Sequence, residues 1–529
     1  METATALHLS DRPPDESLPV LEETVGGLLR EQVRRHPDAM ALVATTHAGQ
    51  RRSWTYAELL SAARHTCGSL LSVAEPGDHV ALWAPNVAEW PIVQYAAALA
   101  GVTLVALNPA LRPAELDHAL RLSRASVLIH ADRMRTYDMA AVVEQVTPGI
   151  PELDEVISLS DVGRLYGSPV DPEELSEPGA PAMMQFTSGT TGRPKGVLLS
   201  HRSLVNNARF TMLTAEVAPG AVTIAPLPAF HTAGCVISHL GPAFVGGAVV
   251  LIERFDPAEV LAEMAQWQAS VLFSVPTVLG AVLHAALQGD RPGPQLDTVL
   301  VGASTVPGTM IEAVEQTFGA SVHNLYGQTE LSPVLSLTRR SDSRADLVTS
   351  VGRPLPHTGA RIVDPATGAV QPLGVAGEIC ARGYNQMLSY FDDPEATAAT
   401  VDAEGWLHTG DLGSMDERGM ITLSGRLKEL IIRGGENISP AEIEIALAAH
   451  PAVAESAVIG LPDERWGEIV AAVVTTHEPV KPGLEQELID HCLARLTPFK
   501  VPVRWFFRAE LPHTPSGKVQ KFVLRAELS

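Results

Sequence analysis

Two kinds of apolar segment alternate through the middle of the chain. Short runs rich in β-branched residues are typical of buried strands, and they cover residues 271–275, 298–302 and 321–326. Apolar positions with the period of a helix cover residues 255–267, 276–287 and 309–318. Asp256 and Pro257 are typical of a helix start, and Gly319 of a helix end. The alternation predicts an α/β fold whose parallel sheets are covered by helices.

Polar loops follow three of the predicted strands. Such sheets bind ligands beyond the carboxyl ends of their strands, so the loops after residues 183–186, 298–302 and 324–326 are candidates for a site. The first loop, TSGTTGRPKG at residues 187–196, holds three glycines, four hydroxyls and one lysine. Glycine lets several backbone N–H groups point at one anion. The loop therefore predicts a phosphate cradle, although its spacing does not fit the P-loop pattern, and a solvated turn is the alternative.

The C-terminal part of the chain has a different pattern. Ser439 and Glu442, with Pro440 at the first helical position, predict a capping box. Strand-like runs at 456–460, 468–476 and 503–507 and a helical run at 484–496 follow. We expect four parts in the chain: a flexible tail over residues 1–20, a large domain over 21–425, a hinge at 426–428, and a small α+β domain over 429–529.

Two long uncharged runs, residues 90–111 and 217–252, require a test as membrane spans. The first is interrupted at Gly101 and at Asn108–Pro109, which predicts a buried helix followed by a buried strand. Prolines interrupt the second run repeatedly. Neither is a continuous apolar stretch of roughly 20 residues, so we expect no stable membrane insertion.

The charge and the cysteines narrow the class of protein further. Acidic residues outnumber basic ones by 61 to 38, giving a net charge of −23, which disfavours nucleic acid and anionic lipid as partners. The cysteines are far apart and form no CxxC pattern: Cys67, Cys235, Cys380 and Cys492. This spacing supports neither a disulfide framework nor a zinc cluster. With no signal-peptide pattern at the N-terminus, we expect a cytoplasmic protein.

Three further loops carry charged residues that suit a nucleotide. Glu330, at the end of NLYGQTE, is a carboxylate of the kind that Mg²⁺ prefers beside phosphate oxygens. Asp411, at the end of WLHTGD, offers oxygens that accept from both hydroxyls of a ribose. Lys518, in HTPSGK, is a second loop lysine. Each residue alone also fits an ordinary solvated loop, so the argument depends on their combination.

Six segments occur in one order: TSGTTGRPKG, NLYGQTE, GEICARG, WLHTGDLG, GRLKELIIRGGENISPAEIE and TPSGKVQK. This combination resembles the adenylate-forming superfamily, which includes acyl-CoA synthetases, aryl-CoA ligases, luciferases and stand-alone adenylation domains. The resemblance extends over about residues 30–529. It implies a large N-terminal domain of parallel αβα-type sheets with a small barrel-like subdomain, followed by a small mobile C-terminal domain.

The resemblance also implies a reaction in two halves. A carboxylate attacks the α-phosphate of ATP, which gives an acyl-adenylate and pyrophosphate, and the thiol of CoA then displaces AMP. Transfer of this kind needs positioning and charge stabilisation more than covalent help. The implied partners are a small-molecule carboxylic acid, ATP with Mg²⁺, and CoA as co-substrate.

Residues that match the family's motifs take implied roles. Glu330 would bind Mg²⁺, Thr329 would approach the α-phosphate, and Lys518 would stabilise the charge that develops between carboxylate and phosphate. Asp411 would take the ribose hydroxyls, with Arg426 close by. The other implied nucleotide-binding positions are the loop residues Thr187, Ser188, Gly189, Thr190, Thr191, Gly192 and Lys195 for the β- and γ-phosphates, Tyr326 for the adenine, and Asn324, Gly327 and Gln328.

The C-terminal domain of the family rotates between the two half-reactions, and Lys518 would be withdrawn after adenylation. Lys428 occupies the hinge position in this chain. Rotation would bring Gly434 and Gly435 to the active site, where small residues suit a narrow tunnel for the pantetheine arm of CoA.

The acyl pocket follows from the same resemblance. His231 matches a family position near the substrate carboxylate, although a packed core histidine is the alternative. The expected lining comprises His231, Val236, the turn Gly302–Ala303–Ser304, Gly327 and Gln328. This set holds no lysine, arginine or acid, so a buried amine or second carboxylate on the substrate would lack a partner. We therefore expect an acid with an apolar aliphatic or aromatic tail.

Other readings stay open from the sequence. The adenylate could pass to a carrier-protein thiol or an amine, or the activated group could be an oxyanion such as nitrite for N–N bond formation. The strong negative charge offers no obvious basic patch for the 3′-phosphate of CoA, for which Arg433 is a candidate. A nucleotide-binding protein without catalysis is disfavoured, because Lys518, Glu330 and Asp411 are all present.

Overall fold

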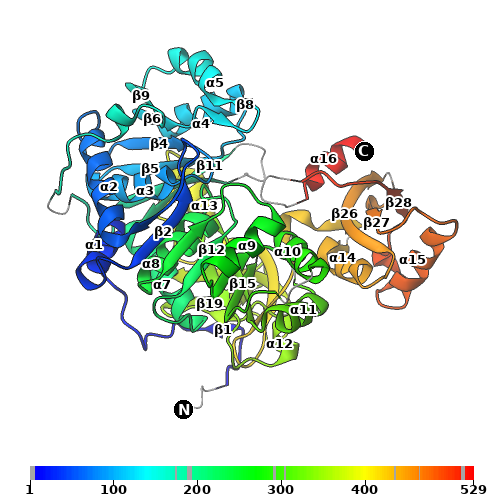
Figure 1. Ribbon diagram of the computed structural model, residues 1–529. Coiled ribbons are helices and arrows are strands. Elements are labelled where there is room, and N and C mark those ends of the chain that lie inside the picture. Colours follow the sequence, from blue (N-terminus) through cyan, green and yellow to red (C-terminus); the bar gives the residue numbers. More distant parts are fainter. Residues whose placement is uncertain are drawn as a thin grey trace. The chain divides into compact units, whose positions relative to one another are not determined.

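The computed structural model describes residues 6–172, 175–187, 194–289, 293–302, 306–433, 436–463, 465–513 and 519–529 (Figure 1). The chain divides into two compact units. The larger unit comprises residues 12–360 and 381–407. The other comprises residues 1–11, 361–380 and 408–529.

A nine-stranded mixed sheet contains the predicted alternation of strands and helices. Its strand order is β18 (Arg353–Pro354), β17 (Val334–Leu337), β16 (Ser321–Gly327), β15 (Thr298–Gly302), β14 (Val271–Ser274), β12 (Val222–Ala225), β13 (Ala248–Leu251), β2 (Met40–Thr45) and β3 (Arg51–Thr55). The pairings from β16 through β2 are parallel, as expected, and the edge strands β17, β18 and β3 pair antiparallel. The sheet is therefore mixed, with a parallel centre.

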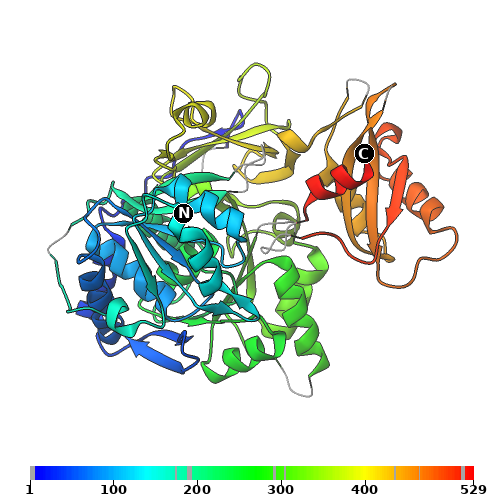
Figure 2. The same ribbon diagram turned by 90° about the horizontal axis from the view of Figure 1, so that it is seen from above.

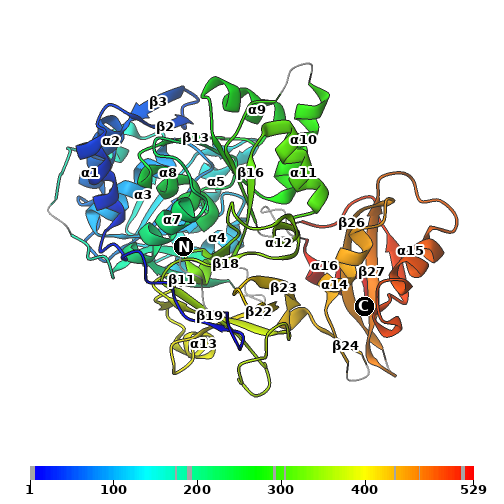
Figure 3. The same ribbon diagram turned by 90° about the horizontal axis from the view of Figure 1, so that it is seen from below.

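Three helices lie side by side along one face of this sheet (Figure 3): α9 (Pro257–Gln266), α10 (Pro276–Gln288) and α11 (Gly308–Phe318). The Asp256 side chain accepts from the backbone N–H groups of Ala258 and Glu259, which confirms the predicted helix start. Gly319 ends α11 with a φ of 70°, a left-handed conformation that glycine adopts without strain. The apolar faces of these helices bury against the strands in one continuous core.

A second mixed sheet of seven strands lies in the same unit. Its order is β21 (Ser389–Tyr390), β11 (Lys195–Ser200), β10 (Pro181–Thr187), β5 (Thr103–Leu107), β4 (His79–Trp83), β6 (Val127–His130) and β9 (Glu155–Ser158). The strands from β10 through β9 are parallel. The predicted strand at residues 183–186 thus belongs to a different sheet from the strands that precede the other two candidate loops.

Further helices of this unit are α1 (Val25–Arg35), α2 (Tyr56–Leu70), α3 (Glu89–Ala100), α4 (Pro113–Ser123), α5 (Met139–Val146), α6 (Val162–Leu165), α7 (His201–Thr214), the π-helix η2 (Ala233–Leu240), α8 (Gly241–Phe244), α12 (Arg344–Thr349) and α13 (Pro394–Thr400). The uncharged run 90–111 forms most of α3 and then β5, as predicted, and Gly101 ends the helix. Run 217–252 folds into β12, η2, α8 and β13. No helix among the described residues has the length and apolar character that crossing a bilayer requires.

A small five-stranded sheet has the order β1 (Asp11–Arg12), β19 (Thr358–Val363), β20 (Gly377–Gly383), β22 (Leu407–Met415) and β23 (Ile421–Arg426). We call this sheet and its loops the small β subdomain; the resemblance implies a barrel-like subdomain here, and closure into a barrel stays a prediction. The chain passes from one unit to the other within four of these strands: β1, β19, β20 and β22.

The C-terminal α+β fold has two buried faces. Its sheet comprises β24 (Ile431–Arg433), β25 (Glu436–Ile438), β26 (Val453–Asp463), β27 (Gly467–Thr476) and β28 (Arg504–Phe507). Alternate residues of β26 and β27 pack against α14 (Pro440–Ala448) and α15 (Leu484–Leu493), and the residues between them pack against α16 (Lys521–Leu528). The sheet thus lies between α15 and α16 (Figure 2).

The predicted capping box at Ser439 is wrong. Pro440 does open α14, but within the described residues the Ser439 side chain caps no helix N–H group, and its hydroxyl donates to the carbonyl of Ser424. Both carboxylate oxygens of Glu442 accept from the Lys500 ammonium instead, at 2.8 and 2.7 Å. Tertiary partners therefore replaced the local pair that the sequence pattern favours.

Candidate functional site

The glycine-rich loop lies at the end of a β-hairpin. Strands β10 and β11 pair antiparallel with Thr187 opposite Lys195, so the loop between them closes at these two residues. Ser188, Gly189, Thr190, Thr191 and Gly192 lie outside the described residues. The hairpin holds Lys195 at the point where the loop re-enters the sheet.

Tyr390 links the loop lysine to the candidate metal ligand. The Lys195 ammonium lies 4.4 Å from the centre of the Tyr390 ring, a cation–π contact. The Tyr390 hydroxyl donates to Oε1 of Glu330 at 2.8 Å. Burial and the neighbouring Glu330 carboxylate raise the pKa of Tyr390, so its phenol stays protonated and remains a donor. A cation, a phenol and a carboxylate from three distant segments therefore form one chain of contacts.

Backbone contacts hold this chain of contacts in place. Strand β21 pairs with β11, with Tyr390 opposite Val197, and the Phe391 N–H donates to the Gly196 carbonyl. The Met387 N–H donates to the Glu330 carbonyl at 2.8 Å. The carboxyl end of β16 and the hairpin loop of the other sheet are thereby tied together. The sequence analysis missed Tyr390, whose only signal is its place in the segment after GEICARG.

The ends of β15 and β16 meet at the same edge of the nine-stranded sheet. The strands are parallel, with Gly302 opposite Leu325. Gly302 and Gly327 lie at this edge, and close packing requires glycine at both positions. A Cβ on Gly302 would lie 2.5 Å from Leu325 Cδ1, and a Cβ on Gly327 would lie 1.9 Å from the Pro333 carbonyl oxygen. Gln328, Thr329 and Glu330 follow, half-exposed. Ala303 and Ser304 lie outside the described residues.

Two residues of β16 that the resemblance assigns to the nucleotide are buried. Tyr326 lies in the last part of the strand and pairs with Ser336. The side-chain amide of Asn324 donates to the Ser350 carbonyl at 3.1 Å, and the backbone N–H of Asn324 donates to Thr338 Oγ1. These contacts give Asn324 a role in holding the strand end, which positions the loop that follows.

His231 lies just before the π-helix η2. Its backbone carbonyl accepts from the Gly234 and Cys235 N–H groups, and its ring lies beside that of Phe230, with centres 4.3 Å apart. Val236 is buried within the helix. π-helical turns are frequent at functional sites, because they shift the side chains that follow out of the ordinary helical register.

The other unit contains the candidate ribose contact. Strands β22 and β23 place Asp411 opposite Arg426, and the Arg426 Nε lies 3.0 Å from Asp411 Oδ1. Asp411 is 7% exposed, whereas Arg426 is exposed. Lys428, in the 3₁₀ turn Leu427–Glu429, is exposed at the predicted hinge.

The segment that follows Lys518 in the sequence is anchored by ion pairs to residues near the predicted hinge. Lys518, Gly434 and Gly435 lie outside the described residues. Lys521 pairs with Glu429 at 3.0 Å and with Glu444 at 2.8 Å. Burial opposes the charge on Lys521, but the two carboxylates outweigh it and raise the pKa of the amine. The ion pairs tie the start of α16 to the residue that follows Lys428.

Comparisons with known proteins match both the N-terminal and the C-terminal parts of the chain. A family model described as AMP-binding enzyme matches residues 29–391, and one described as AMP-binding enzyme C-terminal domain matches residues 442–518. The chain belongs to the AMP-binding enzyme family. The predicted membership and fold class are therefore confirmed.

Relatives in this family are named for CoA ligation. A methyl-dioxo-octahydroindenyl-propanoyl:CoA ligase of Rhodococcus jostii (strain RHA1) is 37% identical, covering 89% of this chain and 93% of the relative. The mitochondrial medium-chain acyl-CoA ligase ACSF2 of Rattus norvegicus is 32% identical, covering 96% and 88%. The structure of o-succinylbenzoate CoA synthetase from Bacillus subtilis with its acyl-adenylate intermediate has a TM-score of 0.84 at 29% identity, covering 96% and 98%. This AMP-binding enzyme is an acyl-CoA synthetase, for which ATP and CoA are substrates.

Proposed function

We propose that this AMP-binding enzyme activates a carboxylic acid with an apolar tail as its acyl-adenylate and transfers the acyl group to the thiol of CoA. The observation that carries the proposal is the chain of contacts Lys195–Tyr390–Glu330, because it links an ammonium group that suits phosphate to a carboxylate that suits Mg²⁺. The carboxylate of the acid would attack the α-phosphorus, and the bond from that phosphorus to the pyrophosphate oxygen would break.

The residues at the strand ends fit the phosphates of ATP. Lys195 and the loop that begins at Thr187 would hold the β- and γ-phosphates, and Thr329 would donate to the α-phosphate. The Tyr390 hydroxyl contacts Oε1 of the Glu330 carboxylate, so the metal would bind at Oε2. One carboxylate is sufficient here, because Mg²⁺ in nucleotide sites is bound by one or two carboxylates together with phosphate oxygens. The donor set therefore fits Mg²⁺, which supplies neutralisation of phosphate charge when bound.

The remaining roles follow from the resemblance to the family. Asp411 would accept from the ribose hydroxyls, and its contact with Arg426 orients the carboxylate. Tyr326 would stack along the adenine, and His231 would contact the acid. Lys518 would stabilise the charge shared between carboxylate and phosphate. Rotation at Lys428 would then replace Lys518 by Gly434 and Gly435 for thioester formation.

The acyl pocket is proposed to be apolar. Val236, one of the residues expected to line it, is fully buried. The names of the two curated relatives refer to a medium-chain acid and to a fused-ring propanoic acid, which supports a hydrocarbon-rich tail for this chain as well. A buried methylene contributes about 0.8 kcal/mol, so kcat/KM is expected to rise about fourfold per CH₂ until the pocket is filled.

The C-terminal domain offers a site for the nucleotide end of CoA. The Trp466 indole is 40% exposed, and the guanidinium groups of Arg433 and Arg465 lie 5.7 and 5.0 Å from its ring centre. An exposed indole stacks on a nucleobase, and guanidinium groups bind phosphate. The pattern supports CoA over the other acceptors and adds Trp466 and Arg465 to the candidate Arg433.

Replacing Trp466 by alanine is expected to raise KM for CoA about tenfold, because stacking on a base contributes about 1–3 kcal/mol. Pyrophosphate release in a single turnover without CoA should stay unchanged, since the first half-reaction does not use this site. Phe522→Ala, which removes another exposed aromatic side chain of the same domain, is the matched control. An unchanged KM for CoA would exclude Trp466 from the acceptor site.

Replacing Tyr390 by phenylalanine is expected to weaken the apparent affinity for Mg²⁺ about tenfold or more, since partners that orient a metal ligand typically contribute 10–100-fold. The ring beneath Lys195 is kept in this variant, whereas Tyr390→Leu removes it and should reduce ATP use further. Initial rates of pyrophosphate release against Mg²⁺ concentration measure the effect. Equal Mg²⁺ dependence in wild type and Tyr390→Phe would contradict the proposed orienting role.

The proposed function is tested by measuring pyrophosphate release over a panel of acids, each with and without CoA. The panel comprises straight-chain acids of increasing length, benzoates, cinnamates, a dicarboxylate and an amino acid. Turnover that requires CoA and an apolar acid, with the matching acyl-CoA found by mass, is the expected result. Release that ignores CoA, or that occurs with nitrite alone, would favour another acceptor or another oxyanion.

A further inference from the structure

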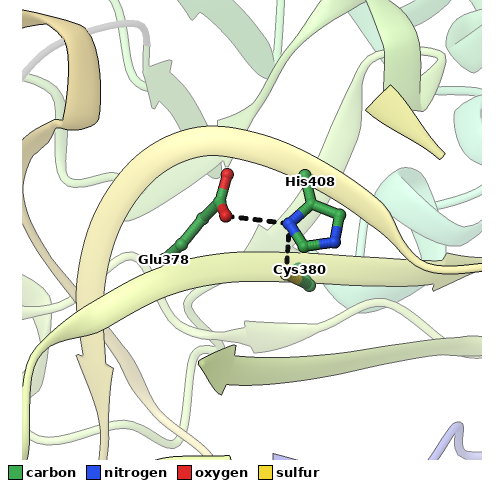
Figure 4. Close-up of side chains that lie close together, drawn as sticks. All are labelled: Glu378, Cys380 and His408. Carbon is green, nitrogen blue, oxygen red and sulfur yellow. Dashed lines mark hydrogen bonds and ion pairs between the residues drawn. The ribbon is translucent and has the colours of Figure 1, made fainter. Parts of the chain in front are cut away.

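Three side chains of different chemistry converge in the small β subdomain (Figure 4). Glu378 and Cys380 lie two residues apart on β20, so they share one face of the strand, and His408 lies on the neighbouring strand β22. His408 Nδ1 lies 2.8 Å from Glu378 Oε2 and 3.5 Å from Cys380 Sγ. All three candidate ligand atoms lie within 4.8 Å of one another.

The separations from His408 Nδ1 to the other two ligand atoms are close to those of a zinc site. Zinc bonds of about 2.0–2.1 Å to nitrogen, about 2.0–2.2 Å to oxygen and about 2.3 Å to sulfur, at tetrahedral angles, place nitrogen and sulfur about 3.5 Å apart and nitrogen and oxygen about 3.3 Å apart. The pair His408–Cys380 is thus already at the required separation. The pair His408–Glu378 needs to open by about 0.5 Å, which exchanges a hydrogen bond for two metal bonds.

The arrangement differs from a nucleophile–base pair. In a catalytic triad the carboxylate and the thiol contact opposite nitrogens of the imidazole, whereas here both contact Nδ1. Three donor atoms that lie within 4.8 Å of one another suit a cation better than a proton relay. Carboxylate, thiolate and imidazole together are donors that zinc accepts.

The surroundings provide orientation and access. The N–H of Gly410 donates to Glu378 Oε1 at 3.0 Å, which leaves Oε2 directed at His408. This contact is of the kind that fixes metal-ligating carboxylates. Cys380 is fully buried and the Glu378 side chain is 9% exposed, but the His408 side chain is 31% exposed. A cation can therefore enter beside the imidazole, and water can complete the coordination there.

We propose that Glu378, Cys380 and His408 form a binding site for a thiophilic divalent cation, with Zn²⁺ as the expected ion. Binding takes the thiolate of Cys380 and the neutral imidazole of His408, whose one proton then resides on Nε2, and the thiol proton passes to solvent. His408 and Asp411 lie on the same strand, so an ion held here fixes the segment that leads to the proposed ribose contact. The second part of the proposal, which rests on the proposed function, is that Zn²⁺ bound at this site regulates the use of ATP.

The site is tested by titrating the full-length, metal-free enzyme with Co²⁺ as a spectroscopic probe. A thiolate-to-cobalt charge-transfer band that saturates at one equivalent, and that Zn²⁺ removes by competition, is the expected result. The band should be lost in Cys380→Ser and kept in Cys492→Ser, which changes another buried cysteine. No band in the wild type, or a band retained in Cys380→Ser, would overturn the proposal.

A second variant tests the site without changing the buried Cys380, whose replacement could disturb folding. His408→Gln changes the half-exposed ligand, and it should weaken Co²⁺ binding at least tenfold while the protein stays folded by circular dichroism. Zn²⁺ should also raise KM for ATP in the wild type but not in Cys380→Ser. Equal inhibition of the wild type and Cys380→Ser by Zn²⁺ would overturn only the claim that the site regulates ATP use. The cobalt spectrum tests metal binding by itself, and its result does not depend on the proposed function.

Discussion

Replacing Lys518 by alanine is expected to lower the rate of acyl-adenylate formation about 10²–10³-fold, while a supplied acyl-adenylate is still converted to the thioester. The reason is that one well-placed donor at a developing charge contributes about this much to a rate. In the proposed second half-reaction the C-terminal domain would take a different orientation, in which this lysine would be withdrawn. Pyrophosphate release in a single turnover measures the first half, and acyl-CoA formed from synthetic acyl-adenylate measures the second.

Lys481→Ala is the matched control for this experiment, because Lys481 lies in the same domain with a side chain that is 77% exposed. It should leave both halves unchanged. Loss of both halves in Lys518→Ala would contradict the separation of the two steps by domain rotation. Retention of both would remove Lys518 from the chemistry.

Replacing Glu330 by glutamine is expected to reduce ATP-dependent turnover about 10²-fold or more at ordinary Mg²⁺ concentrations. The amide keeps the size of the side chain but lacks the negative charge that a hard cation requires. Raising the Mg²⁺ concentration should restore part of the rate, which a purely structural defect would not show. Initial rates over a Mg²⁺ series, with Glu395→Gln as an exposed control in the same unit, provide the measurement. A Mg²⁺ dependence identical to that of the wild type would exclude Glu330 as the metal ligand.

The elements that the sequence predicts correctly are those with local signals. Asp256 and Pro257 start α9, and Gly319 ends α11, because a cap and a left-handed residue act within a few positions of the chain. The Ser439 box fails for a related reason. Its two side chains have stronger partners at Ser424 and Lys500, which lie far along the chain and carry no local signal.

The same distinction applies to the site. The motif positions Glu330 and Lys195 are visible in the sequence, but the tyrosine that joins them comes from residue 390 through the pairing of β21 with β11. Strand pairing between distant segments follows from the whole fold and cannot be read from a window of sequence. The division of the strands between two sheets has the same origin.

The candidate cation site shows the limit of cysteine spacing. The four cysteines predict no zinc cluster, because none has another close by in the sequence. Only one cysteine takes part in the cluster, and its companions are a glutamate two residues away and a histidine on the next strand. Mixed donor sets of this kind become visible only when the strand register is known.

The central claim, that an acid is activated through its adenylate, is tested most directly with a substrate labelled with ¹⁸O in its carboxylate. An acid from the panel that supports turnover is incubated with ATP, Mg²⁺ and CoA, and the products are analysed by mass. If a carboxylate oxygen attacks the α-phosphorus and the thiol then displaces AMP, one ¹⁸O atom appears in AMP and none in pyrophosphate. Label in pyrophosphate or phosphate, with ADP as the nucleotide product, or acyl-CoA formed without label in AMP, would contradict the account.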